Sequence, residues 1–185
     1  MLKKIERMPD SSKNNRIPSL VAIFVMVSAC FVSGQDPNSV RFNALFLTNF
    51  AKFVQWPDET TFDEIVITVL GNDEVVEELK KISEVAAIRG KKLVVKVCQA
   101  ASAIPESHMV FIPENQSRLL PEVLRIVENK SVLIVTNKKG LAEQGAAINI
   151  NNLYWKQRYE INQKALAVHK LIAKPELYRL GKVIE

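Results

Sequence analysis

The chain has 185 residues, of which 48% are hydrophobic, and a formal net charge of +5. This length is enough for one domain with its own hydrophobic core. Residues 1–30 contain five of the Lys and Arg residues and only two acidic residues, so the rest of the chain is close to neutral. A nearly neutral body without a dense Lys/Arg run argues against a nucleic-acid partner.

The first 35 residues have the pattern of an export leader. Basic residues precede an uncharged stretch that begins after Arg16 and ends before Asp36, and its most apolar part is residues 20–27. This order is typical of a secretory signal peptide, and we therefore expect an exported protein. The uncharged stretch is also about long enough to span a bilayer, so an N-terminal membrane anchor is the alternative interpretation.

Cys30, one of only two cysteines, ends the tetrapeptide VSAC, which resembles a bacterial lipobox. In lipoproteins such a cysteine is acylated and becomes the membrane anchor. Ordinary cleavage after Ala29 or Gly34 is the alternative, and both interpretations stay open. If Cys30 is acylated or removed, Cys98 has no intramolecular disulfide partner. Because Cys98 lies in the run LVVKVCQ, we expect a buried strand thiol there.

From Ser39 the sequence alternates between helical and extended patterns. Residues 39–55 predict a helix, because phenylalanines recur at spacings of four, four and three. We expect these phenylalanines to form one stripe that packs against a sheet. The stripe consists of Phe42, Phe46, Phe50 and Phe53.

Pro57 predicts the end of this helix, since the residue before a proline avoids helical geometry. Asn49 lies on the aromatic stripe, so if it is buried it must be hydrogen-bonded. Trp56 has two interpretations: it closes the core, or it lies half exposed at the end of the helix.

The middle of the chain predicts alternating strands and helices. Short apolar runs that are rich in β-branched residues predict strands at 64–71, 92–98, 107–113 and 131–137. Helical periodicity predicts helices at 73–86 and 117–129, and the second helix tolerates Pro121 only in its first turn or at a kink.

The C-terminal third departs from this alternation. The segment GLAEQG is too short for a long crossover helix. Residues 146–150 and 157–162 predict two strands that are joined through NNLYWK, and hence an antiparallel pair. Residues 163–185 predict a final helical segment that is interrupted at Pro175. The whole order predicts a single compact α/β domain over residues 39–185. We expect a mostly parallel sheet flanked by helices, with the antiparallel pair near its C-terminal edge.

No pattern in the sequence carries catalysis. The turn at Gly71 precedes a predicted helix, but a single glycine lacks the spacing of a dinucleotide or phosphate loop. His108 and His169 are far apart in sequence, and neither belongs to a cluster with metal-ligand spacing. We therefore predict no metal site, no cofactor and no enzymatic activity.

Four segments together resemble the YfiR-like family of exported bacterial regulators over about residues 42–185: FLTNFAKFVQWP, GAAINI, YEIN and KPELYRLGKVI. Their order and spacing match the family, and Leu180 falls in what the family pattern makes a final helix. We expect most of the matching positions to be structural. They are Asn49, Phe50, Lys52, Phe53, Pro57, Asn149, Glu160 and Asn162, together with Trp56, Gly145, Ile148 and Ile161.

The resemblance implies a compact α/β domain in the periplasm that regulates a membrane-bound signalling protein. In the best-known arrangement, such a protein represses an inner-membrane diguanylate cyclase by binding its periplasmic sensor region. An outer-membrane lipoprotein relieves the repression. This sequence has Ser107 where many relatives have a cysteine, so redox control by disulfides is not implied here.

If the protein acts by binding a sensor, we expect Trp56, Tyr178 and Arg179 at the interface, because aromatic residues and arginine dominate binding hot spots. Membrane association through the leader or a lipid on Cys30 stays open, as does a homodimer. The alternative hypothesis is a small-ligand-binding or enzymatic periplasmic domain. Its ligand would lie at the carboxyl ends of the strands, near Gly71, Pro113 and Asn137.

Overall fold

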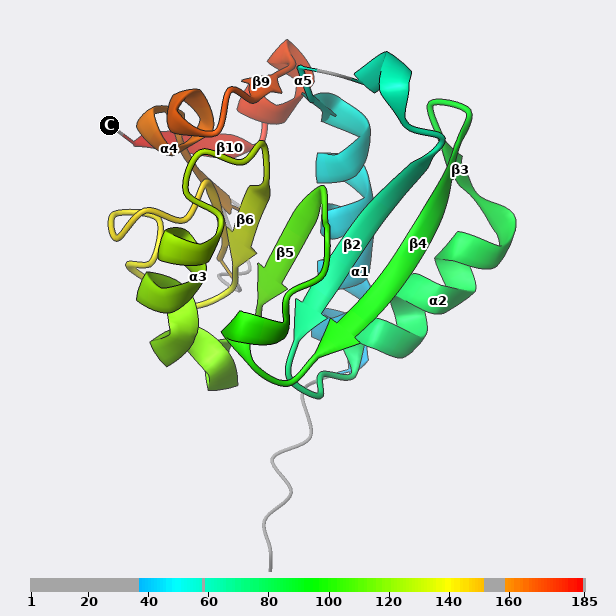
Figure 1. The fold of residues 1–185 in the computed structure, drawn as a ribbon, viewed down its shortest axis with the longest axis horizontal. Helices are drawn as coiled ribbons and strands as arrows, with labels where there is room; N and C mark the ends of the chain where they lie inside the picture. The colour runs from blue at the N-terminus through cyan, green and yellow to red at the C-terminus, as the bar shows by residue number, and fades with distance from the viewer. Residues whose placement is uncertain (1–36, 58, 152–158, 185) are drawn as a thin grey trace, which may run out of the picture. The chain divides into compact units, whose positions relative to one another are not determined.

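The computed structural model describes residues 37–57, 59–151 and 159–184, which form an α/β unit around a central sheet (Figure 1). The strands of this sheet are β2 (Glu64–Leu70), β3 (Ala87–Ile88), β4 (Lys91–Cys98), β5 (Met109–Ile112), β6 (Leu133–Thr136), β7 (Ile148–Ile150), β8 (Tyr159–Asn162) and β10 (Gly181–Ile184). Their spatial order is β10-β8-β7-β6-β5-β2-β4-β3.

Most neighbouring strands are parallel, as the alternation of strands and helices predicted. The run β4-β2-β5-β6-β7 is parallel throughout, whereas β8 is antiparallel to β7. The predicted fold class is therefore confirmed, including the antiparallel pair towards the C-terminal end. Two further short strands, β1 (Val54–Gln55) and β9 (Ile172–Ala173), form a separate antiparallel pair.

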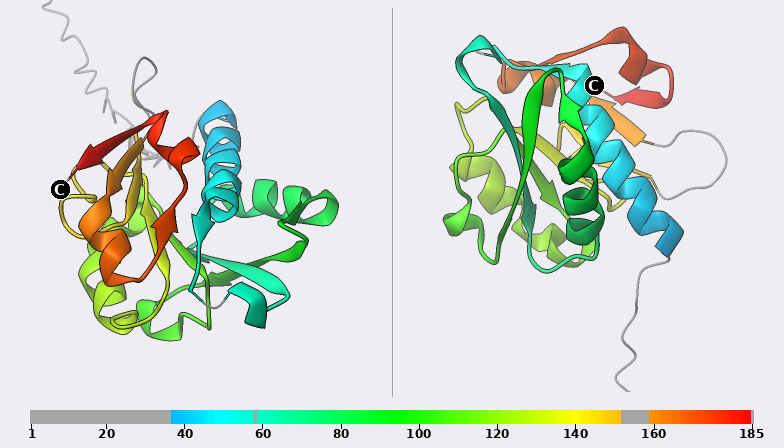
Figure 2. Two further views of the ribbon diagram at one scale, coloured as in Figure 1. Left: turned by 90° about the horizontal axis from the view of Figure 1, so that it is seen from above. Right: turned by 90° about the vertical axis from the view of Figure 1, so that its right-hand side faces the viewer.

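Helices cover both faces of the sheet. Helices α1 (Pro37–Phe53) and α2 (Val75–Val85) lie on one face, and α3 (Leu120–Ile126) lies on the other (Figure 2). Pro121 is in the first turn of α3, where its missing N–H has no intrahelical partner to lose. Of the two predicted positions for Pro121, the first turn of the helix is thus confirmed.

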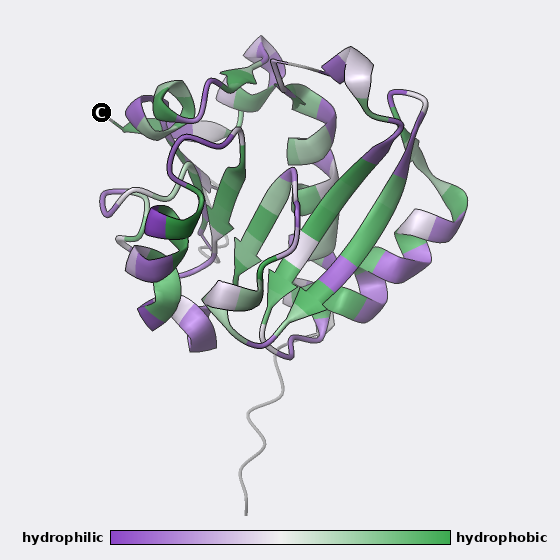
Figure 3. Ribbon diagram, viewed as in Figure 1, coloured by the Kyte–Doolittle hydropathy of each residue, from purple (hydrophilic) through white to green (hydrophobic). Residues whose placement is uncertain are grey.

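Side chains of the central strands alternate between two hydrophobic cores. On β5, Met109 and Phe111 belong to the core that includes α1 and α2, whereas Val110 and Ile112 belong to the core that includes α3. All four side chains are fully buried. Because such strands are buried on both faces, their sequences are continuous apolar runs, as the hydropathy colouring of Figure 3 shows.

The predicted helical segment at residues 163–185 is only partly correct. This part of the chain forms α4 (Gln163–Val168), then β9, then α5 (Pro175–Tyr178), and it ends as strand β10. Lys170 adopts a φ of 55°, a left-handed conformation that ends the helix. Pairing of β9 with β1 and of β10 with β8 then outweighs the helical preference of the sequence. Leu180 consequently lies in the turn after α5 and not in a helix.

Helix α1 buries a different face from the predicted one. Its core face consists largely of small or medium side chains, and the fully buried members are Ala44, Leu47, Phe50 and Ala51. Phe42, by contrast, is 51% exposed. The prediction of a buried stripe is therefore confirmed for Phe50, wrong for Phe42 and only partly correct for Phe46 and Phe53, which are half-buried.

The physical reason is that α1 has apolar residues on two opposite faces. Small residues at Ala44 and Ala51 let the helix approach the sheet closely, which bulky rings at those positions would prevent. Asn49 and Lys52 share the solvent side with Phe42 and are exposed. The helix ends at Phe53, two residues before the end of the predicted helix at residue 55. It ends there because Val54 and Gln55 pair with β9.

These positions generate a matched pair of stability predictions. Phe50→Ala removes a ring from the core and is expected to lower the free energy of unfolding by about 3–5 kcal/mol. Phe42→Ala changes a solvent-exposed ring and is expected to cost no more than about 0.5 kcal/mol. Urea denaturation of both variants measures the difference. Equal losses in the two variants would contradict the orientation of α1.

Candidate functional site

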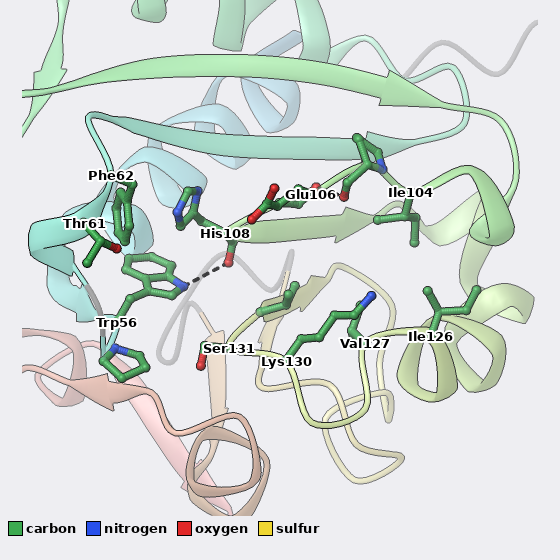
Figure 4. A pocket seen from close by; sticks show the side chains of 14 residues that line it. Trp56, Thr61, Phe62, Ile104, Glu106, His108, Ile126, Val127, Lys130 and Ser131 are labelled. Carbon is green, nitrogen blue, oxygen red and sulfur yellow. Dashed lines mark hydrogen bonds between the residues drawn. The ribbon is translucent and has the colours of Figure 1, made fainter.

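A cavity of about 630 Å³ opens at the amino ends of three parallel strands, β2, β5 and β6 (Figure 4). Residues from the segments that precede these strands line it. Parallel strands begin at the same edge of a sheet, so segments that are far apart in sequence meet here. Aromatic side chains form one end of the cavity, and the rest is lined mainly by residues 104–107 and 126–132.

The aromatic end consists of Trp56, Phe62 and His108. The Trp56 indole Nε1 donates a hydrogen bond to the backbone oxygen of His108 over 3.2 Å, and the two rings meet edge to face at 5.9 Å. The Phe62 ring lies 4.1 Å from the His108 ring. Trp56 is only 5% exposed. Of the two interpretations for Trp56, the structure therefore shows the one in which it closes the core.

Arg89 holds Trp56 and the end of α1 together. Its guanidinium donates to the backbone oxygens of Ala51 (2.7 Å) and Lys52 (2.5 Å), which lie at the C-terminal end of α1. The same group pairs with the Glu59 carboxylate and lies 5.8 Å from the Trp56 ring. A cation at the C-terminus of a helix is favourable because the last carbonyl groups are unpaired and carry partial negative charge.

Two cations flank the aromatic end of the cavity. Besides Arg89 beside Trp56, the Lys91 ammonium lies 4.8 Å from the centre of the Phe62 ring and donates to the Phe62 backbone oxygen. Aromatic cages bind cationic ligands through unoccupied ring faces. Here each ring already has a cation close by, but Arg89 is paired with Glu59, and the charged residues that line the cavity itself, Glu106 and Lys130, have opposite signs.

His108 is held as a neutral side chain. Its Nδ1 accepts a hydrogen bond from the backbone N–H of Val66 over 3.0 Å, so the proton of the neutral ring is on Nε2. Burial lowers the pKa of His108 below its ordinary value, while the nearby Glu106 carboxylate acts in the opposite direction. At neutral pH His108 is therefore uncharged, and its Nδ1 is engaged in holding β2 to the start of β5.

Ser107 is buried in the cavity wall, and its hydroxyl takes part in two hydrogen bonds. Its hydroxyl donates to the backbone oxygen of Pro105 over 2.7 Å. Because its only proton is used there, the Thr68 hydroxyl must donate to the Ser107 oxygen, also over 2.7 Å.

Cys98 is buried and free, as expected, and burial raises the pKa of its thiol. Within the described ranges, no group of His, Cys, Asp and Glu could hold a metal ion.

Polar residues of β6, β7 and β8 form a hydrogen-bond network. The Asn149 side chain accepts from the Thr136 hydroxyl over 2.7 Å and donates to the Glu160 carboxylate over 3.2 Å. Asn162 accepts from the backbone N–H of Ala165 and thereby caps α4. These contacts give Asn149, Glu160 and Asn162 a part in holding β6, β7, β8 and α4 together.

The residues predicted at a partner interface do not form one exposed surface. Tyr178 is half-buried at the end of α5, and Arg179 is exposed in the turn that follows, but Trp56 is buried in the cavity wall. The pairing of β1 with β9 brings the chain at Val54 beside Ala173, close in sequence to α5. Of these three residues, Tyr178 and Arg179 offer contact area to a partner and Trp56 does not.

At Gly71, one of the three positions where a ligand site was predicted at the carboxyl ends of the strands, the Gln116 side chain occupies the adjacent space. Gly71 has a φ of 79°, and a Cβ atom at this position would lie 2.8 Å from the Gln116 side chain. At the start of α2, the Asp73 carboxylate accepts a hydrogen bond from the N–H of Val75 over 2.9 Å. An anion site at this turn would compete with that carboxylate. The cavity lies at the opposite ends of the strands.

The sequence matches the model of the YfiR/HmsC-like family over residues 41–182. The chain therefore belongs to this family, as the four motifs predicted. No curated protein matches it significantly. Among solved structures, a conserved domain protein from Vibrio cholerae O1 biovar El Tor has a similar fold, with a TM-score of 0.53 at 11% identity. The match covers 82% of this chain and 61% of that one, so this chain spans about three fifths of its structural relative.

Membership of the YfiR-like family supports a periplasmic regulator role in general. The leader and Cys30 lie outside the described residues. In the part of the chain that is described, none of the helices is both long and apolar enough to cross a bilayer.

Proposed function

We propose that this protein is a non-catalytic regulator that binds the periplasmic sensor region of an inner-membrane diguanylate cyclase and represses it. The observation that carries the proposal is the family match over residues 41–182. In the cavity, Nδ1 of His108 is used in a hydrogen bond to the backbone N–H of Val66.

Repression by binding needs no chemistry. A protein that binds one conformation of a sensor more tightly than another shifts the sensor's population by that difference in affinity. A difference of about 1.4 kcal/mol changes the ratio of the two conformations tenfold, and about 5.5 kcal/mol takes it from 1:99 to 99:1. A moderate interface contributed by exposed side chains supplies energies of this size.

Deletion of the gene is expected to raise intracellular cyclic di-GMP, and re-expression of the wild-type protein is expected to lower it again. An Arg179→Ala copy is expected to lower it less, because Arg179 is exposed and arginine is common in hot spots. Arg118→Ala, which changes an exposed arginine on a different element, is the matched control. An unchanged cyclic di-GMP level on deletion would refute the repressor function.

The leader forms a separate part of the proposal. We propose that residues 1–35 direct export to the periplasm and that the mature protein begins at or near Cys30. Intact-mass analysis of the protein from its native membranes tests this. A mass increase that corresponds to acylation, absent from a Cys30→Ser variant, establishes the lipoprotein form, and a mature terminus after Cys30 excludes it. An uncleaved leader would contradict both forms of cleavage.

The cavity favours small-ligand binding as a second candidate function. Its volume falls in the range of small-molecule sites, and Phe62 and Trp56 supply apolar ring surface. The charged residues that line the cavity, Glu106 and Lys130, have opposite signs, so we expect the ring surface to select the ligand. Indole is therefore expected to raise the melting temperature of the wild-type protein, and Phe62→Ala is expected to abolish the rise. The absence of any shift would remove this candidate.

A further inference from the structure

The solvent side of α1 carries an apolar ridge that the fold covers only in part. Phe42 and Leu45 are 51% and 44% exposed, and Phe46 and Phe53 are half-buried beside them. Successive residues of a helix are about 100° apart, which places Phe42, Phe46, Asn49 and Phe53 on one side, roughly opposite the buried Ala44 and Ala51. We call these five residues, Phe42, Leu45, Phe46, Asn49 and Phe53, the outer face of α1.

A helix that is apolar on both sides is typical of one that packs between two partners. One partner of α1 is the sheet of its own domain, and the other side is open to solvent over Phe42 and Leu45 (Figure 2). The ridge from Phe42 to Phe53 spans about 16 Å, or three helical turns. This length matches the contact that a second helix makes along it.

The charged residues of α1 itself are both positive. Arg41 and Lys52 are the charged residues of α1, they are exposed, and they lie near opposite ends of the ridge. On the neighbouring helix α2, Lys80 and Lys81 pair with Glu77 and Glu78, and Glu84 is also exposed. The outer face of α1 is thus an apolar ridge with a cation near each end.

This charge pattern distinguishes between two occupants. If a second copy of the chain packed on the ridge in an antiparallel orientation, Arg41 of one copy would lie opposite Lys52 of the other. Like charges in that arrangement repel. A helix with an apolar stripe and carboxylates along its flanks meets the ridge and both cations favourably.

We propose that the outer face of α1 is the surface that binds the regulated sensor, and that its occupant is an amphipathic helix flanked by Asp or Glu residues. This inference rests on the proposed function and adds the contact surface and the chemistry of the partner. Tyr178 and Arg179 then make a smaller, second contact with the same partner. Recognition of a helix by spaced apolar anchors is a common mode of protein binding.

The test uses the full-length protein in a strain that lacks the native gene. A copy with Phe42→Ser and Leu45→Ser is compared with a copy that has Val168→Ser and Ile172→Ser. The control positions are even more exposed, at 66% and 63%, so both pairs remove surface apolar area without opening the core. Melting temperatures of the purified variants verify folding. We expect the α1 variant to leave cyclic di-GMP at the deletion level and the control to restore it.

Crosslinking identifies the occupant. A photo-crosslinking amino acid at Asn49, which is exposed within the ridge, is expected to form an adduct with the sensor helix of an inner-membrane signalling protein. The same amino acid at Val168 is expected to form none. Adding Phe42→Ser and Leu45→Ser should reduce the Asn49 adduct roughly tenfold or more, as loss of hot-spot anchors does. Arg41→Glu with Lys52→Glu should also abolish it, and lysines at the partner's acidic positions should restore it.

The outcomes separate this inference from the proposed function. If the wild-type protein does not lower cyclic di-GMP, the proposed function fails. If the wild-type protein lowers it and the Phe42→Ser, Leu45→Ser copy does so equally well, only the role of α1 fails. An Asn49 adduct with a second copy of the chain or with phospholipid, in place of a sensor helix, would likewise overturn the assignment of the occupant.

Discussion

The edge-to-face contact between Phe50 and Tyr159 fixes how α1 is rotated on the sheet. The two ring centres are 4.9 Å apart, and both side chains are buried. Phe50 can reach Tyr159 only if α1 turns its small residues to the sheet, which places Phe42 on the solvent side. The same rotation directs the chain after Phe53 into β1 and brings Trp56 to the cavity. The outer face of α1 and the cavity therefore both depend on this contact.

Tyr159 also fixes the C-terminal segment. Its hydroxyl donates to the backbone oxygen of Leu177 over 2.7 Å, and burial raises the pKa of this hydroxyl, so it remains a donor at neutral pH. Strand β10 then passes so close to the ring that a Cβ atom at Gly181 would lie 2.6 Å from it. A side chain at Gly181 would force β10 away from β8. One tyrosine thus connects α1, α5 and the edge of the sheet.

Local sequence patterns predicted what local forces determine, and they failed where distant contacts decide. The buried strand β5 and the helix with Pro121 in its first turn follow from apolar runs and proline geometry. The rotation of α1 about its own axis does not follow from the sequence, because Phe42 and Ala44 each belong to an apolar face with helical spacing. The strand β10 was missed because its pairing with β8 is a long-range contact. The cavity was missed because Arg89, the residue that holds Trp56 in place, is distant in sequence and lies in a turn.

The fold and the recognition of partners are carried by different side chains. Phe50, Tyr159 and Arg89 each contact several elements, so changing any of them alters the fold and any function together. Trp56 belongs to this group, because its indole bonds to His108 and its loss would open the cavity wall. Phe42 and Leu45 cost the fold little when they are changed, since water already contacts about half of each side chain. A loss of regulation at these two positions therefore reports on binding and not on folding.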